Sequence, residues 1–178
     1  MINWPIDQPT LTAETASGRL TLRPLLESDI EPVFNACQDV TISAFTRVPY
    51  PYDLEMATDF VRESSVAYRN HVSATFAIEL NGEFAGTIGL HSLQLGDHLA
   101  EVGYWVVEHF RGRGICTSAL KMISELSLDV MGFRRIEALA NFDNLPSQKV
   151  LERAGFNRDA LLKNRATKSD GNILLIRL

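Results

Sequence analysis

Residues 106–117 read Val-Val-Glu-His-Phe-Arg-Gly-Arg-Gly-Ile-Cys-Thr, and this stretch decides the fold because the period of the apolar residues changes across it. Before it, residues 99–107 alternate as a half-buried strand requires. After it, apolar side chains recur at helical spacing, at Ile115, Ala119, Ile123, Leu126 and Val130. The stretch therefore predicts a strand that enters a helix through a glycine-rich turn.

Such a turn is suited to bind an anion. Its backbone N–H groups point outward at the positive end of the helix dipole. Gly112 and Gly114 can adopt positive φ angles and leave room for a bulky phosphate. Arg111 and Arg113 add donors that carry positive charge.

The spacing of the turn separates several phosphate-binding motifs. A P-loop needs Gly-x-x-x-x-Gly-Lys-Ser/Thr and a dinucleotide-binding turn needs Gly-x-Gly-x-x-Gly, and neither pattern occurs here. The pattern Arg-x-x-Gly-x-small, at Arg111, Gly114 and Cys116, resembles the pyrophosphate loop of the GNAT superfamily of N-acetyltransferases, which binds acetyl-coenzyme A. The alternative is a glycine-rich turn without a ligand, so the flanking sequence has to decide.

Composition limits the class of protein. The chain has 178 residues, 46% of them apolar, and we expect an extended leader over residues 1–18 followed by one domain over residues 19–178. No apolar run approaches the ~20 residues of a membrane span, and the net charge of −5 disfavours nucleic acid as a partner. Two cysteines and four histidines show no metal-ligand spacing. These features predict a cytoplasmic protein, monomeric or homodimeric, with no metal and no membrane or nucleic-acid partner.

The remaining pattern predicts a mixed sequence of elements. Residues 19–25 read as an edge strand that stops at Pro24, and a capping box at Ser28 and Glu31 begins a helix. A proline-tyrosine loop, Pro49–Tyr52, precedes a helix capped by Asp53. Further elements are an antiparallel meander over residues 75–107 with a turn at Asn81-Gly82, a strand over 134–140 parallel to 99–107, a helix opened by residues 144–147, and a closing strand pair over 156–163 and 172–178 around Ser169-Asp170-Gly171.

Three further segments resemble the same family. They are residues 86–90, Gly-Thr-Ile-Gly-Leu; residues 101–106, Glu-Val-Gly-Tyr-Trp-Val; and residues 144–156, which run from Asn144 to Gly155-Phe156. With the turn, they are similar to the branch that acetylates the N-terminal amines of ribosomal proteins. The resemblance covers residues 19–178 and implies an α+β GNAT fold. Its central twisted sheet is mixed but mostly antiparallel, with roughly six or seven strands, about four flanking helices and a splayed parallel pair at the acetyl-coenzyme A site.

The resemblance also implies which residues bind the cofactor. In the family, the strand before the turn diverges from its parallel neighbour, and its free backbone groups bind pantetheine and the thioester carbonyl. The resemblance assigns this role to Trp105, Val106 and Val107. The diphosphate is expected on the backbone amides of the turn, at Arg111, Gly112, Arg113, Gly114, Ile115, Cys116 and Thr117. Asn144 matches a position that hydrogen-bonds the pantetheine arm, and its alternative role is that of a helix cap.

Two residues are expected to move protons. An alkylamine has a pKa near ~10, so it arrives charged and needs a base. Glu101 is the candidate, because it lies on the same strand face as Gly103 and Trp105. The alternative is that Glu101 is a solvated carboxylate at the edge of the strand. The usual family acid is a tyrosine where this chain has Leu151. Ser147, one helical turn earlier, resembles a serine given that role in the ribosomal-protein branch. An acetyl-cysteine relay at Cys116 is a further alternative, since a thiol at a helix N-terminus can be acidified.

These observations predict an acetyl-CoA-dependent N-acetyltransferase that works by direct attack of a primary amine, with a protein N-terminal α-amino group as the acceptor. Within the same class, the alternative is a small-molecule enzyme that acetylates a polyamine or an aminoglycoside-like amine. From another class, the alternative is a non-catalytic acyl-CoA sensor, which Leu151 suggests. An RNA-binding module that uses Arg-Gly-Arg-Gly conflicts with the acidic net charge.

Overall fold

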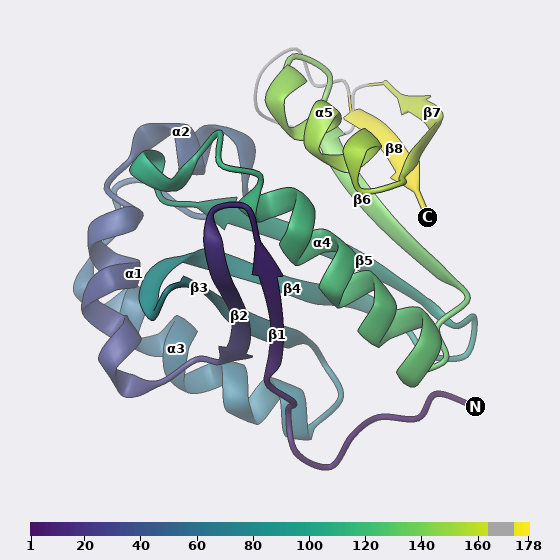
Figure 1. The fold of residues 1–178 in the computed structure, drawn as a ribbon, viewed down its shortest axis with the longest axis horizontal. Helices are drawn as coiled ribbons and strands as arrows, with labels where there is room; N and C mark the ends of the chain where they lie inside the picture. Colours follow the sequence, from purple (N-terminus) through teal and green to yellow (C-terminus); the bar gives the residue numbers. More distant parts are fainter. Residues whose placement is uncertain (164–172) are drawn as a thin grey trace.

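The computed structural model describes residues 1–163 and 173–178, which build one mixed sheet with helices on both faces (Figure 1). The strand order is β1-β2-β3-β4-β5-β6-β8-β7, and every neighbouring pair is antiparallel except β5 and β6. The strands are β1 (Leu11–Thr15), β2 (Gly18–Pro24), β3 (Ala74–Leu80), β4 (Glu83–Gln94), β5 (Leu99–Val106), β6 (Arg135–Asn141), β7 (Asn157–Leu162) and β8 (Ile173–Arg177).

Helices cover the two faces of the sheet and bury separate apolar clusters. The helices are α1 (Ile30–Ala36), α2 (Val40–Phe45), α3 (Leu54–Arg69), α4 (Ile115–Glu125) and α5 (Leu145–Arg153), with short turns η1 (Glu27–Asp29), η2 (Glu108–Phe110) and η3 (Leu126–Val130). Along β3, Phe76 and Ile78 belong to the cluster under α4, whereas Ala77 belongs to the cluster under α1 to α3. This alternation follows from the two-residue period of a strand. Among the described residues, no helix is long and apolar enough to cross a membrane.

The parallel pairing that the sequence predicts is confirmed, and the pair is short. β5 pairs with β6 only at Leu99↔Arg135, Ala100↔Ile136 and Glu101↔Glu137, although β5 continues to Val106. Figure 1 shows β6 turning away from β5 toward α5. Beyond Glu101 the β5 backbone therefore has no strand on that side.

Several local expectations are confirmed. The Asn81-Gly82 turn joins β3 to β4 with Asn81 at φ 54°, and the Asp53 side chain accepts the Met56 amide at 2.8 Å to cap α3. The segment Gly112 to Gly114 leads into α4, as the change of period predicts.

Others are wrong. Residues 11–15, expected in a loose leader, form β1 and pair with β2, so β2 is an inner strand and not an edge. The first helical turn is capped by Asp29, which accepts the Leu26 amide at 2.7 Å, and not by a box at Ser28. The expected turn at Ser169-Asp170-Gly171 lies outside the described residues, while the strands on either side of it are present.

The segment between α1 and α3, where the sequence shows no clear period, contains α2. Its cap is Asp39, whose side chain accepts the Thr41 amide at 2.8 Å. Because α2 has only six residues, it is too short to show a helical repeat in the sequence.

Candidate active site

The glycine turn forms an open set of backbone donors at the start of α4. Gly112 and Gly114 adopt φ angles of 76° and 77°, and a side chain at either position would meet no protein atom within 4 Å. Ser118 is the first residue of α4 whose amide bonds back, to the Gly114 carbonyl at 3.0 Å. The amides of Ile115, Cys116 and Thr117 therefore have no acceptor one turn earlier. This arrangement suits a phosphate group.

The guanidinium groups of the two arginines of the turn are engaged by other parts of the protein. The Arg111 guanidinium bonds the Val106 carbonyl at 2.9 Å and pairs with Asp39 at 2.6 Å, and its backbone amide donates to the Glu108 carbonyl at 3.0 Å. The Arg113 guanidinium lies over the Phe110 ring, 5.6 Å from its centre. The expectation that Arg111 supplies a free side-chain and backbone donor is therefore wrong in this structure.

Arg111 instead ties the turn to α2. Partial burial opposes ionisation of Asp39, but hydrogen bonds from Thr41 and Arg111 outweigh it and hold the pKa of this carboxyl below its ordinary range. The carboxylate is thus charged at neutral pH and anchors the arginine. On the other side of the turn, the Ser17 hydroxyl donates to the Arg113 carbonyl at 2.8 Å, so the β1–β2 hairpin supports it as well.

The end of β5 presents backbone groups toward the side that β6 has left. The Val107 amide donates to the Ala85 carbonyl of β4 at 2.9 Å, which corrects its expected role as a free donor. Successive strand residues direct their backbone groups to opposite sides. The groups of Val106 and Tyr104 therefore point away from β4, toward the gap.

A single cavity of about 1510 Å³ joins these features. Its lining includes most of the residues nominated from sequence, namely Glu101, Trp105, Val106, Arg111, Gly112, Gly114, Ile115, Cys116, Thr117, Asn144 and Ser147. Val107 and Arg113 lie outside the lining. Thus the turn, the free edge of β5 and the start of α5 surround one space.

Glu101 lies in this cavity with two partners that the sequence did not identify. Its carboxylate, 16% exposed, is 3.2 Å from the Arg47 guanidinium and 3.8 Å from the His91 imidazole. Arg47 follows α2 and is itself 75% exposed, so it reaches over the cavity from outside. Gly103 leaves room for the imidazole, because a Cβ there would lie 2.7 Å from His91 Nε2.

The surroundings of His91 predict its protonation state. Burial lowers the pKa of His91, Glu101 raises it and Arg47 lowers it, with a net result below the ordinary value of 6.5. In an NMR titration, we expect the His91 midpoint below that value in the wild type, a still lower midpoint in Glu101→Gln, and a higher one in Arg47→Ala. The same midpoint in all three proteins would contradict this arrangement.

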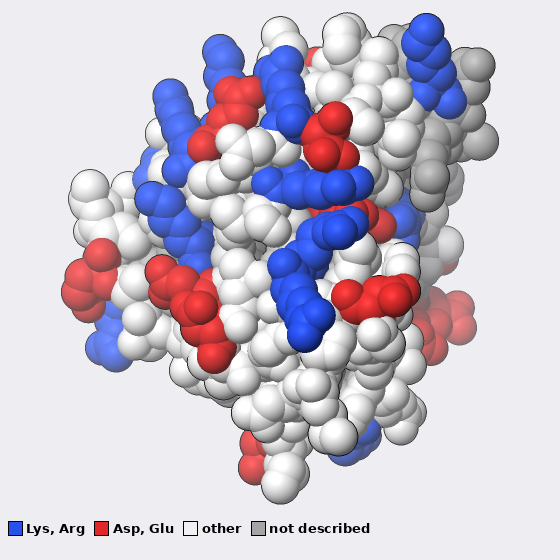
Figure 2. Space-filling view, turned by 90° about the vertical axis from the view of Figure 1, so that its right-hand side faces the viewer, with Lys and Arg blue, Asp and Glu red and all other residues white. Residues whose placement is uncertain are grey.

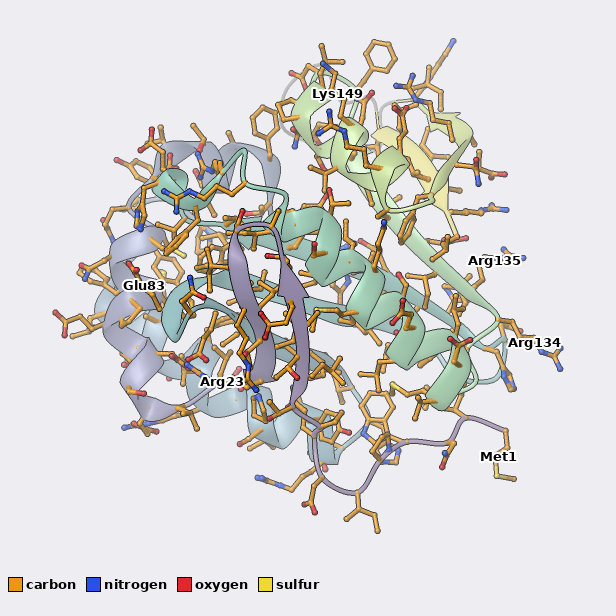
Figure 3. All side chains as sticks on the ribbon, in the orientation of Figure 1. Met1, Arg23, Glu83, Arg134, Arg135 and Lys149 are labelled. Carbon is orange, nitrogen blue, oxygen red and sulfur yellow. The ribbon has the colours of Figure 1, made fainter. Side chains whose placement is uncertain are left out.

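Glu137 occupies the position on β6 next to Glu101 on β5, and it also lines the cavity. It pairs with Arg177 at 3.2 Å and with Arg135 at 3.5 Å. Figure 3 shows Arg135 projecting from the outer end of β6, and Figure 2, which views that side of the molecule, shows acidic and basic side chains interleaved across it. Glu137 is thus held by two arginines at the border of the cavity.

The start of α5 brings Ser147 to the cavity. The Asn144 side-chain oxygen accepts the Ser147 amide at 3.2 Å, so the cap that was weighed against a ligand role is present. The Ser147 hydroxyl lies 2.8 Å from the Tyr104 hydroxyl of β5. Leu151, one turn later, is 1% exposed and packs in the core, whereas Lys149 projects outward from α5 (Figure 3).

Cys116 is not activated in this environment. Burial raises the pKa of its thiol to about 12, and the Arg111 charge only partly offsets this. The thiol is therefore protonated at neutral pH, which removes the premise of an acetyl-cysteine relay. Elsewhere among the described residues, no group of three His, Cys, Asp or Glu side chains could hold a metal ion.

Sequence reasoning missed Arg47, Tyr104 and Ser17. Arg47 and Ser17 lie in segments without a periodic pattern, so nothing in the sequence brings them to the site. Tyr104 stands within the Gly-Tyr-Trp motif, but the alternation of the strand by itself assigns it no role. Only the turn of β6 away from β5 gives its hydroxyl access to α5.

A family model described as an acetyltransferase (GNAT) domain matches residues 19–157. The chain is 26% identical over 167 residues to the uncharacterized N-acetyltransferase YoaA of Bacillus subtilis, covering 90% of this chain and 94% of YoaA. It is 24% identical over 158 residues to the ribosomal-protein-serine acetyltransferase of Escherichia coli, covering 86% and 88% of the two chains.

The fold also matches solved structures. The structure of Mycobacterium smegmatis RimJ in complex with CoA-disulfide superposes with a TM-score of 0.87 and 24% identity, covering 96% of this chain and 87% of RimJ. At this identity the likeness concerns the fold, including the mixed sheet and its parallel pair.

Proposed function

The chain belongs to the GNAT family of acetyltransferases, and from this premise we propose that it transfers the acetyl group of acetyl-CoA to the N-terminal α-amino group of a protein. The observation that carries the proposal is the single cavity that is lined both by the residues with open amides at the start of α4 and by Glu101. A diphosphate and an amine can therefore be bound at two ends of one space.

The residues present fit acetyl-CoA. The amides of Ile115 to Thr117, with the open space at Gly112 and Gly114, receive the diphosphate. The outward backbone groups of Tyr104 and the amide of Val106, whose carbonyl already accepts from Arg111, receive the pantetheine arm, where the parallel ladder has ended. In this assignment the thioester lies between β5 and the start of α5, near Ser147.

The chemistry is direct attack. Glu101 accepts one proton from the ammonium form of the amine, so that a neutral nitrogen can attack the thioester carbonyl. The C–N bond forms, the C–S bond breaks, and the sulfur leaves with the electron pair. The nitrogen then loses a second proton; of the two protons lost, one ends on the sulfur and the one held by Glu101 is released to solvent. Holding both reactants in one cavity supplies much of the rate by orientation.

A protein N-terminus is favoured as the acceptor by two observations. The cavity continues past Glu101 to α2 and the segment Thr46 to Pro49, so it offers room for more than the amine itself. A relative that matches over most of both chains is a ribosomal-protein-serine acetyltransferase. A small cationic amine remains the alternative acceptor.

The experiment combines calorimetry with acetyl-CoA and release of free thiol against a matched panel. The panel contains peptides with a free N-terminus, the same peptides with a blocked N-terminus, and small polyamines. We expect thiol release with the free peptides only. Release with polyamines alone would favour the small-molecule enzyme, and binding without any turnover would favour the acyl-CoA sensor, for which Leu151 is the observation.

A further inference from the structure

Tyr104 and Ser147 meet across the gap between β5 and α5. The two hydroxyl oxygens lie 2.8 Å apart, and the Tyr104 oxygen is 3.4 Å from the Ser147 carbonyl. Both residues line the cavity that contains Glu101. The pair is thus a side-chain bridge at the place where the parallel ladder is interrupted.

The bridge has a preferred direction. A tyrosine hydroxyl carries one hydrogen, and both recorded partners of Tyr104 are oxygens of Ser147. Burial raises the pKa of Tyr104 well above its ordinary value, and the hydrogen bond to Ser147 only partly offsets this. The phenol therefore keeps its proton, and we take the Ser147 hydroxyl as its acceptor, because that oxygen lies at 2.8 Å and the Ser147 carbonyl at 3.4 Å. When the Ser147 hydroxyl accepts that bond, its own hydrogen is directed elsewhere, and the cavity is the open direction.

We propose that Tyr104 is a positioning residue that holds the Ser147 hydroxyl as a hydrogen-bond donor to the leaving sulfur of the thioester. The inference rests on the proposed function, since it concerns the same reaction. As the C–S bond breaks, negative charge develops on sulfur, and the Ser147 O–H donates to it. No proton leaves Tyr104; the proton that finally joins the sulfur is balanced by the second proton that the nitrogen loses after the C–N bond has formed, while the first leaves through Glu101.

A purely structural role for Tyr104 predicts different behaviour. The ring packs against the core under α4, so its loss would affect stability whatever the hydroxyl does. Tyr104→Phe keeps the ring and removes one oxygen, which separates the two roles. Under the proposal this variant lowers kcat, while its melting temperature and its affinity for acetyl-CoA stay near the wild-type values.

The test is a double-mutant cycle on kcat with Tyr104→Phe, Ser147→Ala and the double variant. We expect Tyr104→Phe to lower kcat about 10-fold, as expected for one hydrogen bond. In the Ser147→Ala background the same change has no further effect, because no hydroxyl remains to be oriented. Ser147→Thr keeps a hydroxyl, so in that background Tyr104→Phe lowers kcat again.

Two results would overturn the inference. Additive losses in the cycle would mean that Tyr104 acts independently of Ser147. A changed acetyl-CoA affinity with unchanged kcat would assign Tyr104 to binding or packing.

Failure of the proposed function would look different, because the wild type itself would then release no thiol with any N-terminal peptide. In that case, the same double-mutant cycle is measured on the slow hydrolysis of acetyl-CoA, because hydrolysis also expels the thiolate. A wild type that neither transfers nor hydrolyses the acetyl group contradicts the inference too.

Discussion

Gly114→Val is expected to weaken acetyl-CoA binding at least about 100-fold, which corresponds to roughly 2.7 kcal/mol or the loss of one or two hydrogen bonds to a charged group. Gly114 precedes the open amides of α4, and its side-chain position faces empty space. A valine there meets no protein atom in the free protein, but it occupies the volume that a phosphate needs. Calorimetry with acetyl-CoA measures the effect.

Gly82→Val is the matched control. Gly82 has a φ angle of 84°, close to the 77° of Gly114, and its side-chain position is likewise open, but it lies in the β3–β4 turn. A side chain in the left-handed region costs on the order of 1–2 kcal/mol at either glycine. Both variants should therefore lose similar stability in denaturant unfolding, and only Gly114→Val should lose affinity. Equal affinity in the two variants would show that the turn does not bind the diphosphate.

The elements that sequence predicted share a local cause. The change of apolar period around Gly112 and Gly114, the Asn81-Gly82 turn and the Asp53 cap each depend on residues within a few positions of one another. The conformation of each of these segments is determined locally, because φ preferences, capping and alternation need no distant partner. The order of these elements then indicated the family and the parallel pair.

The parts that sequence did not predict depend on distant contacts. Arg47 reaches Glu101 across 54 positions, and Tyr104 reaches Ser147 across 43. Arg111 looked like a phosphate donor in its own segment, yet Asp39, from another helix, binds its guanidinium. Such pairings are fixed only when β6 diverges from β5 and α2 packs over the turn. The chemistry of the site therefore could not be completed from local patterns.

Glu101→Gln is expected to lower kcat by about 10²–10³-fold near neutral pH, the contribution typical of a positioned general base. Affinity for acetyl-CoA should stay near the wild-type value, since the proposal assigns Glu101 to the amine and the diphosphate to the amides at the start of α4. The defect should shrink as the pH rises past about 8, because more of an N-terminal amine then arrives uncharged and needs no base.

The matched control for Glu101 is Glu137→Gln. This variant removes a carboxylate from the neighbouring position on β6, on the same sheet face and in the same cavity. Glu137 already forms ion pairs with Arg135 and Arg177. Its effect on kcat should stay below about 5-fold, which is the most that an ion pair of ordinary strength contributes. A proton acceptor next to the nucleophile predicts a loss of kcat that is specific to Glu101→Gln and depends on pH. A loss of similar size in both variants that does not change with pH would contradict this role and would indicate that only the total charge of the cavity matters.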